Sequence, residues 1–344
     1  MKFIHIADVH WGARPERDKS FGGIRENEIK ETFQRVIDYA NQQQIDVLLI
    51  AGDFFDRKPS KQQLSEVDYM LSKLVKTRIV MIAGNHDYIS QRDVFSQYRW
   101  KSEVYFLDGK IRNKVIFEDL DTTIYGLSYW TNQITKPLYD HMKPDDTTSF
   151  SILLAHGGDE SHIPIQRDLL KWSGFDYIAL GHIHRPQIIF EDLMAYAGSL
   201  EPLDHTETGR HGFIEGEISE EKQQIHFIPF AKRMYIQVEV MISEDMPANQ
   251  IIDRIETELS YRGNENMYDV ILTGSMDPQI DLDLDPLMDQ YLIRDISYET
   301  KSKWDYDQLL KENDFIIKKV AEILKDEPKA LSYAMEALSY AREK

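Results

Sequence analysis

The amino-acid sequence predicts an α/β fold, and three observations support this prediction. Short apolar runs, rich in β-branched residues, alternate with longer segments of helical spacing, as in α/β domains. Five of the apolar runs are followed by polar side chains that can bind metals. Open α/β sheets bind ligands beyond the carboxyl ends of their strands, so we expect these five clusters to converge on one edge. The chain also has 344 residues, enough for more than one domain. We therefore expect an α/β domain followed by further structure.

The elements of the first domain are predicted from their apolar patterns. Each expected strand is a short apolar run followed by a glycine or a polar break, which is typical of internal strands. The expected strands are 2–7, 45–51, 78–83, 151–155 and 176–180, and the expected helices are 27–43 and 61–76. Two strand-like stretches, 212–218 and 224–230, complete the pattern. The first domain is therefore predicted to cover residues 1–231.

The side chains that follow five of these strands have metal-binding chemistry in common. They offer carboxylate and amide oxygens and imidazole nitrogens, and the chain has no cysteine. This mixture suits borderline divalent ions such as manganese, iron or zinc better than magnesium or calcium. Seven ligands are too many for one site that must also admit a substrate, so we expect two divalent metal ions. The candidate ligands are Asp8, His10, Asp53, Asn85, His156, His182 and His184.

Two neighbouring metal ions, roughly 3.5–4 Å apart, usually share one carboxylate. Asp53 is the predicted bridge because it stands alone at the end of its strand, whereas Asp8 is accompanied by His10. Each motif by itself is common without a metal, since Gly-Asp is usually a turn and paired histidines often serve packing and hydrogen bonding. The presence of all five motifs in sequence order is what favours a metal centre.

The order of the motifs resembles the calcineurin-like metallophosphoesterases, which carry D-x-H, G-D-x-x-D, G-N-H-D/E, H and G-H-x-H in this sequence. Within that superfamily, residues 1 to about 230 are similar to the SbcD-type nuclease subunits of DNA double-strand-break repair. The similar segments are 5–12, 51–56, 83–87 and 198–203. The resemblance implies a sandwich of two β-sheets flanked by helices. Lys58 stands where the phosphatases of the superfamily have glycine, which weakens a phosphatase interpretation.

The resemblance also implies how the residues are used. One ion would be bound by Asp8, His10, Asp53 and His184, and the other by Asp53, Asn85, His156 and His182. The protein would then be a manganese-dependent DNA exonuclease or endonuclease, in which a hydroxide that bridges two Mn²⁺ ions attacks the phosphodiester in line. His86 would protonate the leaving oxygen or stabilise the transition state, with Asp87 holding its ring. A simpler interpretation is that His86 only orients a ligand.

The charge of the chain is unusual for a protein that binds DNA by itself. The formal net charge is −19 and the pI is about 5.0, whereas nonspecific DNA affinity comes mostly from Lys and Arg. Residues 1–114 carry 19 Lys and Arg against 16 Asp and Glu, and the remainder carries 21 against 43. Basic residues such as Arg14, Arg17 and Arg57 follow the predicted metal motifs, either as phosphate contacts or as a solvated face. We expect modest DNA affinity unless a partner adds basic surface.

The α+β module predicted after residue 231 carries no chemical motif. Residues 232–303 alternate as β-α-β, which predicts a small α+β domain whose position corresponds to the DNA-capping domain of the SbcD-like nucleases. Its expected elements are 234–242, 247–261, 268–273, 286–292 and 294–299. In residues 304–344 we expect two helices, separated at 326–328. Each helix carries an apolar stripe, and the stripe of the first helix includes Leu309 and Leu310. These stripes either pack on the α+β domain or, as the resemblance implies, bind an SbcC-like coiled-coil ATPase.

Other features limit the alternatives. The chain shows no leader-like segment and no apolar run long enough to span a bilayer, so we expect a cytoplasmic protein without membrane association. A homodimer is implied by the resemblance alone. Two other functions stay open: a metallophosphoesterase acting on a small phosphorylated molecule or a phosphoprotein, and a non-catalytic binding scaffold. A scaffold need not keep its ligands, and here every ligand position is filled.

Overall fold

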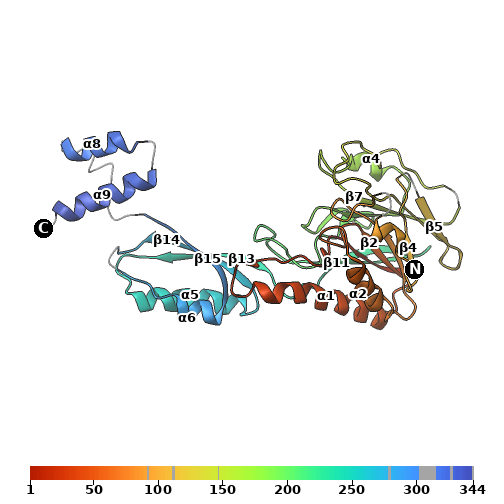
Figure 1. Cartoon of the computed structure of the whole chain (residues 1–344), viewed down its shortest axis with the longest axis horizontal. Coiled ribbons are helices and arrows are strands. Elements are labelled where there is room, and N and C mark those ends of the chain that lie inside the picture. Colours follow the sequence, from red (N-terminus) through yellow and green to blue (C-terminus); the bar gives the residue numbers. More distant parts are fainter. Residues whose placement is uncertain are drawn as a thin grey trace. The chain divides into compact units, whose positions relative to one another are not determined.

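The computed structural model describes residues 1–90, 93–110, 113–145, 147–277, 280–301, 315–325 and 328–342. The chain divides into two compact units, Met1–Tyr235 and Ile236–Lys344, which are considered separately (Figure 1). Three predicted features lie outside the described residues: the boundary between residues 303 and 304, positions 326–327 of the helix separator at 326–328, and Leu309 and Leu310.

The first unit is a sandwich of two six-stranded sheets. The first sheet has the order β12-β11-β1-β2-β3-β4, with β1 to β4 parallel and β11 and β12 antiparallel. Its strands are β1 (Lys2–Ile6), β2 (Val47–Ala51), β3 (Arg78–Ile82), β4 (Val104–Phe106), β11 (Gly212–Ile218) and β12 (Gln223–Pro229). The five strands predicted in this sheet are therefore present.

The second sheet has the order β5-β6-β7-β8-β10-β9, in which β6, β7, β8 and β10 are parallel. Its strands are β5 (Asn113–Phe117), β6 (Thr122–Gly126), β7 (Phe150–His156), β8 (Tyr177–Gly181), β9 (Gln187–Phe190) and β10 (Met194–Tyr196). Only β7 and β8 were predicted. The two flanked sheets confirm the predicted α/β fold class.

Successive residues of the central strands face two different cores, because side chains alternate along a strand. Phe3 and Val47 pack against the second sheet, whereas Ile4 and Leu48 pack against the helices. Both faces of these strands are thus buried, which explains their continuous apolar sequences. A third core lies on the outer face of the second sheet, around Leu153.

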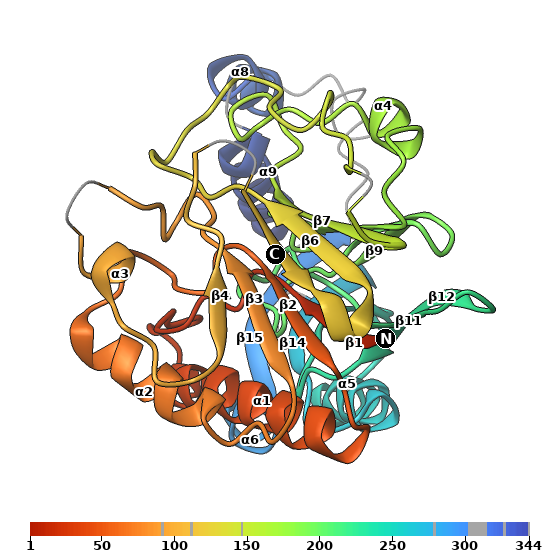
Figure 2. The ribbon, with the colours of Figure 1, turned by 90° about the vertical axis from the view of Figure 1, so that its right-hand side faces the viewer.

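Two helices cover the outer face of the first sheet, α1 (Gly22–Gln42) and α2 (Lys61–Leu71) (Figure 2). Helix α1 buries Ile29, Phe33 and Val36 at helical spacing. Helix α2 begins at a capping box, in which Ser60 and Gln63 satisfy each other's backbone N–H groups. Shorter helices are α3 (Val94–Gln97), η1 (Glu118–Leu120) and α4 (Arg167–Lys171).

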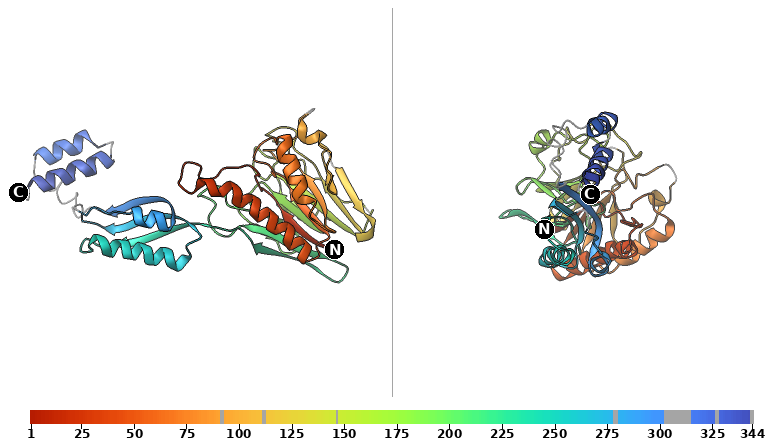
Figure 3. Two further views of the ribbon diagram at one scale, coloured as in Figure 1. Left: turned by 60° about the horizontal axis from the view of Figure 1, so that its bottom comes forward. Right: turned by 90° about the vertical axis from the view of Figure 1, so that its left-hand side faces the viewer.

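The second unit contains a three-stranded sheet with the order β13-β14-β15. Helices α5 and α6 lie on one face of this sheet (Figure 3), where Ile251 and Leu287 join a core with Val238 and Val270. Its elements are β13 (Tyr235–Ile242), α5 (Ala248–Arg262), β14 (Met267–Ser275), α6 (Asp285–Gln290) and β15 (Leu292–Lys301), followed by α8 (Phe315–Ile323) and α9 (Pro328–Arg342). None of the described helices is long and apolar enough to cross a bilayer.

Candidate metal centre

The carboxyl ends of β1, β2, β3, β7 and β8 carry all seven candidate ligands: His156 is the last residue of β7, and the other six lie in the loops that follow the other four strands. The first three strands belong to the first sheet and the other two to the second, and the sheets contact each other through β2, β3, β7 and β8. The expectation that one sheet edge collects every cluster was therefore wrong in this detail. The candidate ligands come from the carboxyl ends of two facing sheets.

The loops after β1 and β2 hold an unusual backbone conformation. Asp8, His10 and Asp53 have φ values of 50°, 49° and 47°, in the left-handed region that non-glycine residues rarely adopt. The Asp8 N–H donates to the carbonyl of Gly52 over 3.2 Å, and the His10 N–H donates to that of Asp53 over 3.1 Å. These bonds link the two loops beyond the ends of their strands. Such strain costs roughly 1–3 kcal/mol per residue and concentrates at functional sites.

Two glycines let the loops approach each other closely. A Cβ on Gly52, whose φ is +88°, would lie 2.4 Å from His156 Nδ1. A Cβ on Gly84 would lie 2.2 Å from Asp53 Oδ1. Any larger residue at either position would displace a candidate ligand, so the glycines of the second and third motifs have a steric reason.

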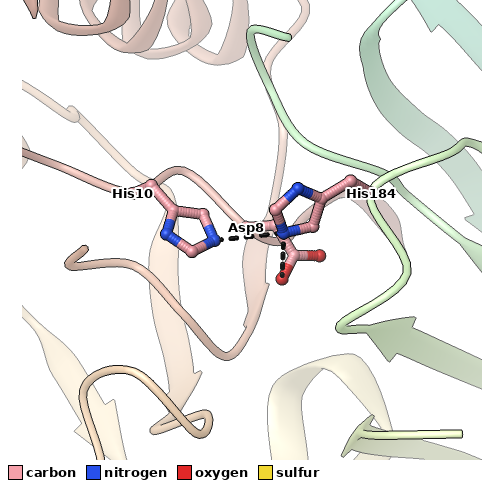
Figure 4. Close-up of side chains that lie close together, drawn as sticks. All are labelled: Asp8, His10 and His184. Atoms are coloured by element: carbon pink, nitrogen blue, oxygen red, sulfur yellow. Dashed lines mark hydrogen bonds and ion pairs between the residues drawn. The ribbon is translucent and has the colours of Figure 1, made fainter. Parts of the chain in front are cut away.

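The first group of side chains consists of Asp8, His10 and His184 (Figure 4). The Nε2 atoms of His10 and His184 are 3.2 Å apart, and His184 Nε2 is 4.0 Å from Asp8 Oδ1. His10 Nε2 also lies 4.0 Å from Asp53 Oδ2. These atoms surround one point from three loops, which is the arrangement that a divalent cation needs.

The second group consists of Asp53, His156 and His182, with Asn85 beside them. His156 Nδ1 donates to the Ala51 carbonyl over 2.8 Å, so in the neutral ring Nε2 carries the lone pair. That nitrogen faces Asn85 Oδ1 at 2.9 Å and Asp53 Oδ2 at 3.3 Å, both acceptors. Buried acceptors that converge in this way need either a proton or a metal cation between them. The donor set therefore fits a divalent metal ion.

Electrostatics keep the central carboxylate charged. Burial by itself would raise the pKa of Asp53, but the charge and the hydrogen bond of His156 outweigh it and hold that pKa well below its usual range. Burial opposes the proton on His156, yet Asp53 raises the pKa of this imidazole to about 9. Without a metal ion, the proton on the His156 ring therefore supplies the positive charge beside Asp53. A metal must displace that proton, so metal affinity should fall in acid.

His86 is exposed and lies beside the first group. Its ring packs edge-on against His10, with centroids 4.7 Å apart, and its Nδ1 donates to the Asp56 carbonyl over 2.9 Å. Its backbone N–H donates to Asp53 Oδ1 over 2.8 Å. The loop that carries His86 is therefore tied to the candidate bridging carboxylate.

Asp87 differs from the expectation that it would hold the His86 ring. It is fully buried, and its carboxylate accepts the N–H groups of Gly84 at 2.7 Å and Phe55 at 3.1 Å. Burial and the charge of Asp53 raise the pKa of Asp87 to about 7. The predicted orienting role is wrong: Asp87 fixes the loops after β2 and β3, and the Asp56 carbonyl orients the His86 ring.

Three acidic residues at the site were not predicted. Asp159 Oδ2 lies 2.6 Å from His182 Nε2, and Glu207 Oε1 lies 2.6 Å from His184 Nδ1. Asp56 Oδ1 lies 3.5 Å from His10 Nδ1. Asp56 closes the second motif and could have been found from it. Asp159 and Glu207 have no local pattern that distinguishes them from other acidic loop residues.

An open cleft adjoins the first group. Its volume is about 590 Å³. It is lined by Gly12, Arg14, Arg17, Asp56, Arg57 and Gln63. The cleft therefore combines three guanidinium groups with Asp56, which neighbours both His10 and His86.

The part of the chain that carries the site matches a known protein family. The family model described as calcineurin-like phosphoesterase matches residues 1–186, more than half of the chain and all seven candidate ligands. The chain belongs to the calcineurin-like phosphoesterase family. The mixed nitrogen and oxygen ligands described above fit the metal dependence of that family.

Relatives of this calcineurin-like phosphoesterase include nucleases. It is 26% identical to the metallophosphoesterase YhaO of Bacillus subtilis, over 80% of this chain and 72% of the relative. It is 28% identical to the DNA double-strand break repair protein Mre11 of Methanopyrus kandleri, over 60% and 50% of the two chains. It is 28% identical to the SbcD component of the SbcCD nuclease of Staphylococcus saprophyticus, over 69% and 71%. The protein is therefore a metal-dependent phosphoesterase with nuclease relatives.

Proposed function

We propose that the protein is a manganese-dependent DNA exonuclease or endonuclease subunit of an SbcCD-like repair complex, acting with two ions. The observation that carries this proposal is the pair of side-chain groups that share Asp53. The ions would be held by Asp8, His10, Asp53 and His184, and by Asp53, Asn85, His156 and His182. The nuclease relatives extend the proposal from phosphoesters in general to DNA.

The residues of the site have distinct parts in this reaction. Bound divalent ions would supply an activated water and would neutralise the phosphoryl oxygens. Asp53 stays ionised and can therefore face both ions. His86 is exposed, and its ring is oriented through the Nδ1–H that donates to the Asp56 carbonyl. In the doubly protonated imidazolium form, Nε2 also carries a proton, which it can give to the departing sugar oxygen. Asp87 keeps the loop of His86 in place through two backbone N–H groups.

The cleft beside the first group supports a polymeric substrate. Arg14, Arg17 and Arg57 line it within the part of the chain whose charge is slightly positive. A small phosphorylated molecule would need only the ions, whereas a DNA strand also presents phosphates on both sides of the scissile bond. Guanidinium groups along the cleft can bind these flanking phosphates. Binding of this kind should weaken steeply with salt.

The end of the second unit supports a protein partner. In α8 and α9, Ile317 and Met335 are buried, whereas the side chains of Phe315, Ile323 and Tyr333 are 80%, 68% and 72% exposed. An apolar helical surface of this kind suits another protein's helices. We propose an SbcC-like coiled-coil ATPase as that partner, and a homodimer of this chain within the complex.

The direct test is digestion of end-labelled DNA by the purified protein with Mn²⁺, alone and with the ATPase. We expect cleavage that requires Mn²⁺ and increases with the ATPase. A simple aryl phosphodiester, phosphorylated nucleotides and a phosphopeptide serve as competing substrates. Hydrolysis of these small substrates without DNA cleavage would instead favour the small-molecule or phosphoprotein function. A purified chain that binds no divalent ion would favour a scaffold.

The partner is tested by substituting the exposed apolar side chains of α8. The double variant Phe315→Asp, Ile323→Asp should lose co-purification with the ATPase and keep hydrolysis of a simple phosphodiester. Lys318→Ala is the matched control, because this exposed residue of the same helix lies off the line of the helix surface that Phe315 and Ile323 share. Unchanged co-purification of the double variant, or of a chain lacking residues 304–344, would contradict this docking site.

A further inference from the structure

His182 and His184 lie two residues apart after β8 but present different ring nitrogens to different groups. His182 turns Nδ1 toward Asn85, 3.0 Å from its Oδ1. His184 turns Nε2 toward His10 and Asp8, at 3.2 and 4.0 Å. His182 also has a φ of 93°, a positive value that neither of its neighbours in the sequence has. Something beyond the backbone must keep each ring in its own orientation.

The outward nitrogen of each ring bonds a carboxylate. His182 Nε2 is 2.6 Å from Asp159 Oδ2, and His184 Nδ1 is 2.6 Å from Glu207 Oε1. An ionised carboxylate can only accept, so the outward nitrogen in each ring carries the hydrogen. A neutral imidazole has one N–H, and the inward nitrogen is then left with the lone pair. The two carboxylates therefore select opposite tautomers for the two histidines.

Both carboxylates are held in place by groups other than His182 and His184. The second oxygen of Glu207 accepts the Ser199 hydroxyl at 2.9 Å and the Leu203 N–H at 3.0 Å. Asp159 Oδ1 accepts the N–H groups of Ser161 and His162 at 2.7 and 2.9 Å. The two acidic residues also lie in different loops, one after β7 and one after β10. Each can thus be removed without disturbing the other's contacts.

We propose that Asp159 and Glu207 are positioning residues that assign His182 to one metal ion and His184 to the other. Each carboxylate fixes the tautomer and the rotation of one imidazole, and so controls the affinity of one ion. This inference rests on the proposed two-metal function. Partners of metal-bound histidines commonly change metal affinity by about 10- to 100-fold when they are removed.

The first experiment is an equilibrium titration of the metal-free full-length protein with Mn²⁺, read by the free-ion signal in electron paramagnetic resonance. Wild type should bind two ions. Glu207→Ala and Asp159→Ala should each bind one ion normally and the second about 10- to 100-fold more weakly. Glu207→Gln and Asp159→Asn, which keep an acceptor oxygen, should recover most of the affinity. Asp119→Ala is the matched control, since Asp119 pairs with Arg78 at the opposite end of β3.

The second experiment separates positioning from a general loss of structure. His184→Ala and His182→Ala should weaken the same ions as Glu207→Ala and Asp159→Ala do, respectively, and at least as strongly, because they remove the ligand itself. Adding Glu207→Ala to His184→Ala should cause no further loss of metal, because the carboxylate acts only through that ring. Additive losses, or two ions bound with wild-type affinity by both alanine variants, would overturn the inference. If wild type itself binds fewer than two ions, the proposed two-metal function fails instead.

Discussion

The two sheets of the first unit supply the candidate metal site in different ways. The loops of the first sheet contribute mostly oxygen ligands, Asp8, Asp53 and Asn85. Backbone hydrogen bonds between the loops after β1 and β2 hold the first two of these. The second sheet contributes imidazoles only, and each outward ring nitrogen bonds an acceptor from another segment. One side of the site is therefore ordered by the backbone, and the other by contacts between side chains and distant loops.

This difference follows from the size and chemistry of the ligands. Aspartate and asparagine side chains are short, so the position of their oxygens is almost decided once φ and ψ are fixed. An imidazole reaches further and has two distinct nitrogens, so rotation and tautomer must be fixed as well. The ligands of the first sheet should therefore tolerate few changes of backbone conformation. The histidines of the second sheet should depend on residues outside the ligand set for their orientation.

Asp53→Asn should damage both sides of the site at once, because Asp53 is the residue that reaches both groups. It lies near His156 at 3.3 Å and near His10 at 4.0 Å. We expect loss of both ions and a fall in DNA cleavage of about 10⁴-fold, equivalent to roughly 5–6 kcal/mol. Metal content by mass spectrometry and initial rates would be measured beside His184→Ala. Two tightly bound ions in Asp53→Asn would remove the bridging assignment.

His86→Asn separates metal binding from proton transfer on the side of the first sheet. His86 belongs neither to the group of Asp8, His10 and His184 nor to that of Asp53, His156 and His182. It lies against His10 and forms a separate group with His10 and Asp56. We expect two ions to stay bound while kcat falls by about 10²- to 10⁴-fold, as when a general acid is removed. Full activity at wild-type metal content would show that His86 takes no part in catalysis. Asp87→Asn should leave kcat much less affected, since Asp87 does not hold the His86 ring.

The contact between the two sheets should depend on pH through His5. His5 on β1 is fully buried and bonds the Tyr177 hydroxyl of β8 at 2.8 Å. Burial lowers the pKa of His5 from 6.5 to about 3. The unfolded chain therefore takes up a proton below pH 6.5 while the folded protein does not. The part of the folding stability that depends on neutral, buried His5 is fully present above pH 6.5 and is lost as the pH falls toward 3.

At pH 5, this protonation should cost the wild type about 2 kcal/mol relative to pH 7, at about 1.4 kcal/mol per pH unit. His5→Leu should lack this part of the pH dependence, although it loses the bond to Tyr177 at both pH values. Urea unfolding of metal-free protein at pH 7 and pH 5, followed by tryptophan fluorescence, measures the difference. Equal pH dependence in the two proteins would mean that His5 is not the titrating group.

A weaker effect is expected in the cleft beside the first sheet. Arg57 is 81% exposed and lines this cleft. Arg57→Ala should raise KM for DNA a few-fold and lower the salt dependence of binding by about one unit of slope, because one phosphate contact is lost. Hydrolysis of a simple phosphodiester should not change. An equal effect on both substrates would place Arg57 in the reaction itself rather than in DNA binding.

Much of the fold could be predicted because the buried strands carry continuous apolar runs. The sequence located β1, β2, β3, β7, β8, β11 and β12, but missed β6 and the three- or four-residue strands β4, β9 and β10. It also missed β5, in which partly buried and exposed residues alternate at the sheet edge. Strands β4, β5 and β9 lie at sheet edges and have weak patterns because their faces are only partly buried. Strands β6 and β10 are internal and buried, but one is a short run with two threonines and the other has only three residues.

The candidate site shows the same division. Asp87 was assigned to the His86 ring because the two are adjacent in sequence, but adjacency does not decide where a side chain points. Asp87 instead turns inward to Gly84 and Phe55. Glu207 lies 23 residues beyond His184, and only the fold brings its carboxylate to that ring.

The amino-acid sequence specified which chemical groups are available and in which order they occur, and that order was enough to indicate the family. This is possible because each ligand directly follows an apolar strand, so its place is encoded locally. The three-dimensional fold was needed to establish that two sheets share the site, which ring nitrogen each histidine presents, and which carboxylates hold the rings. These properties depend on contacts between segments far apart in the chain, and no local pattern specifies such contacts.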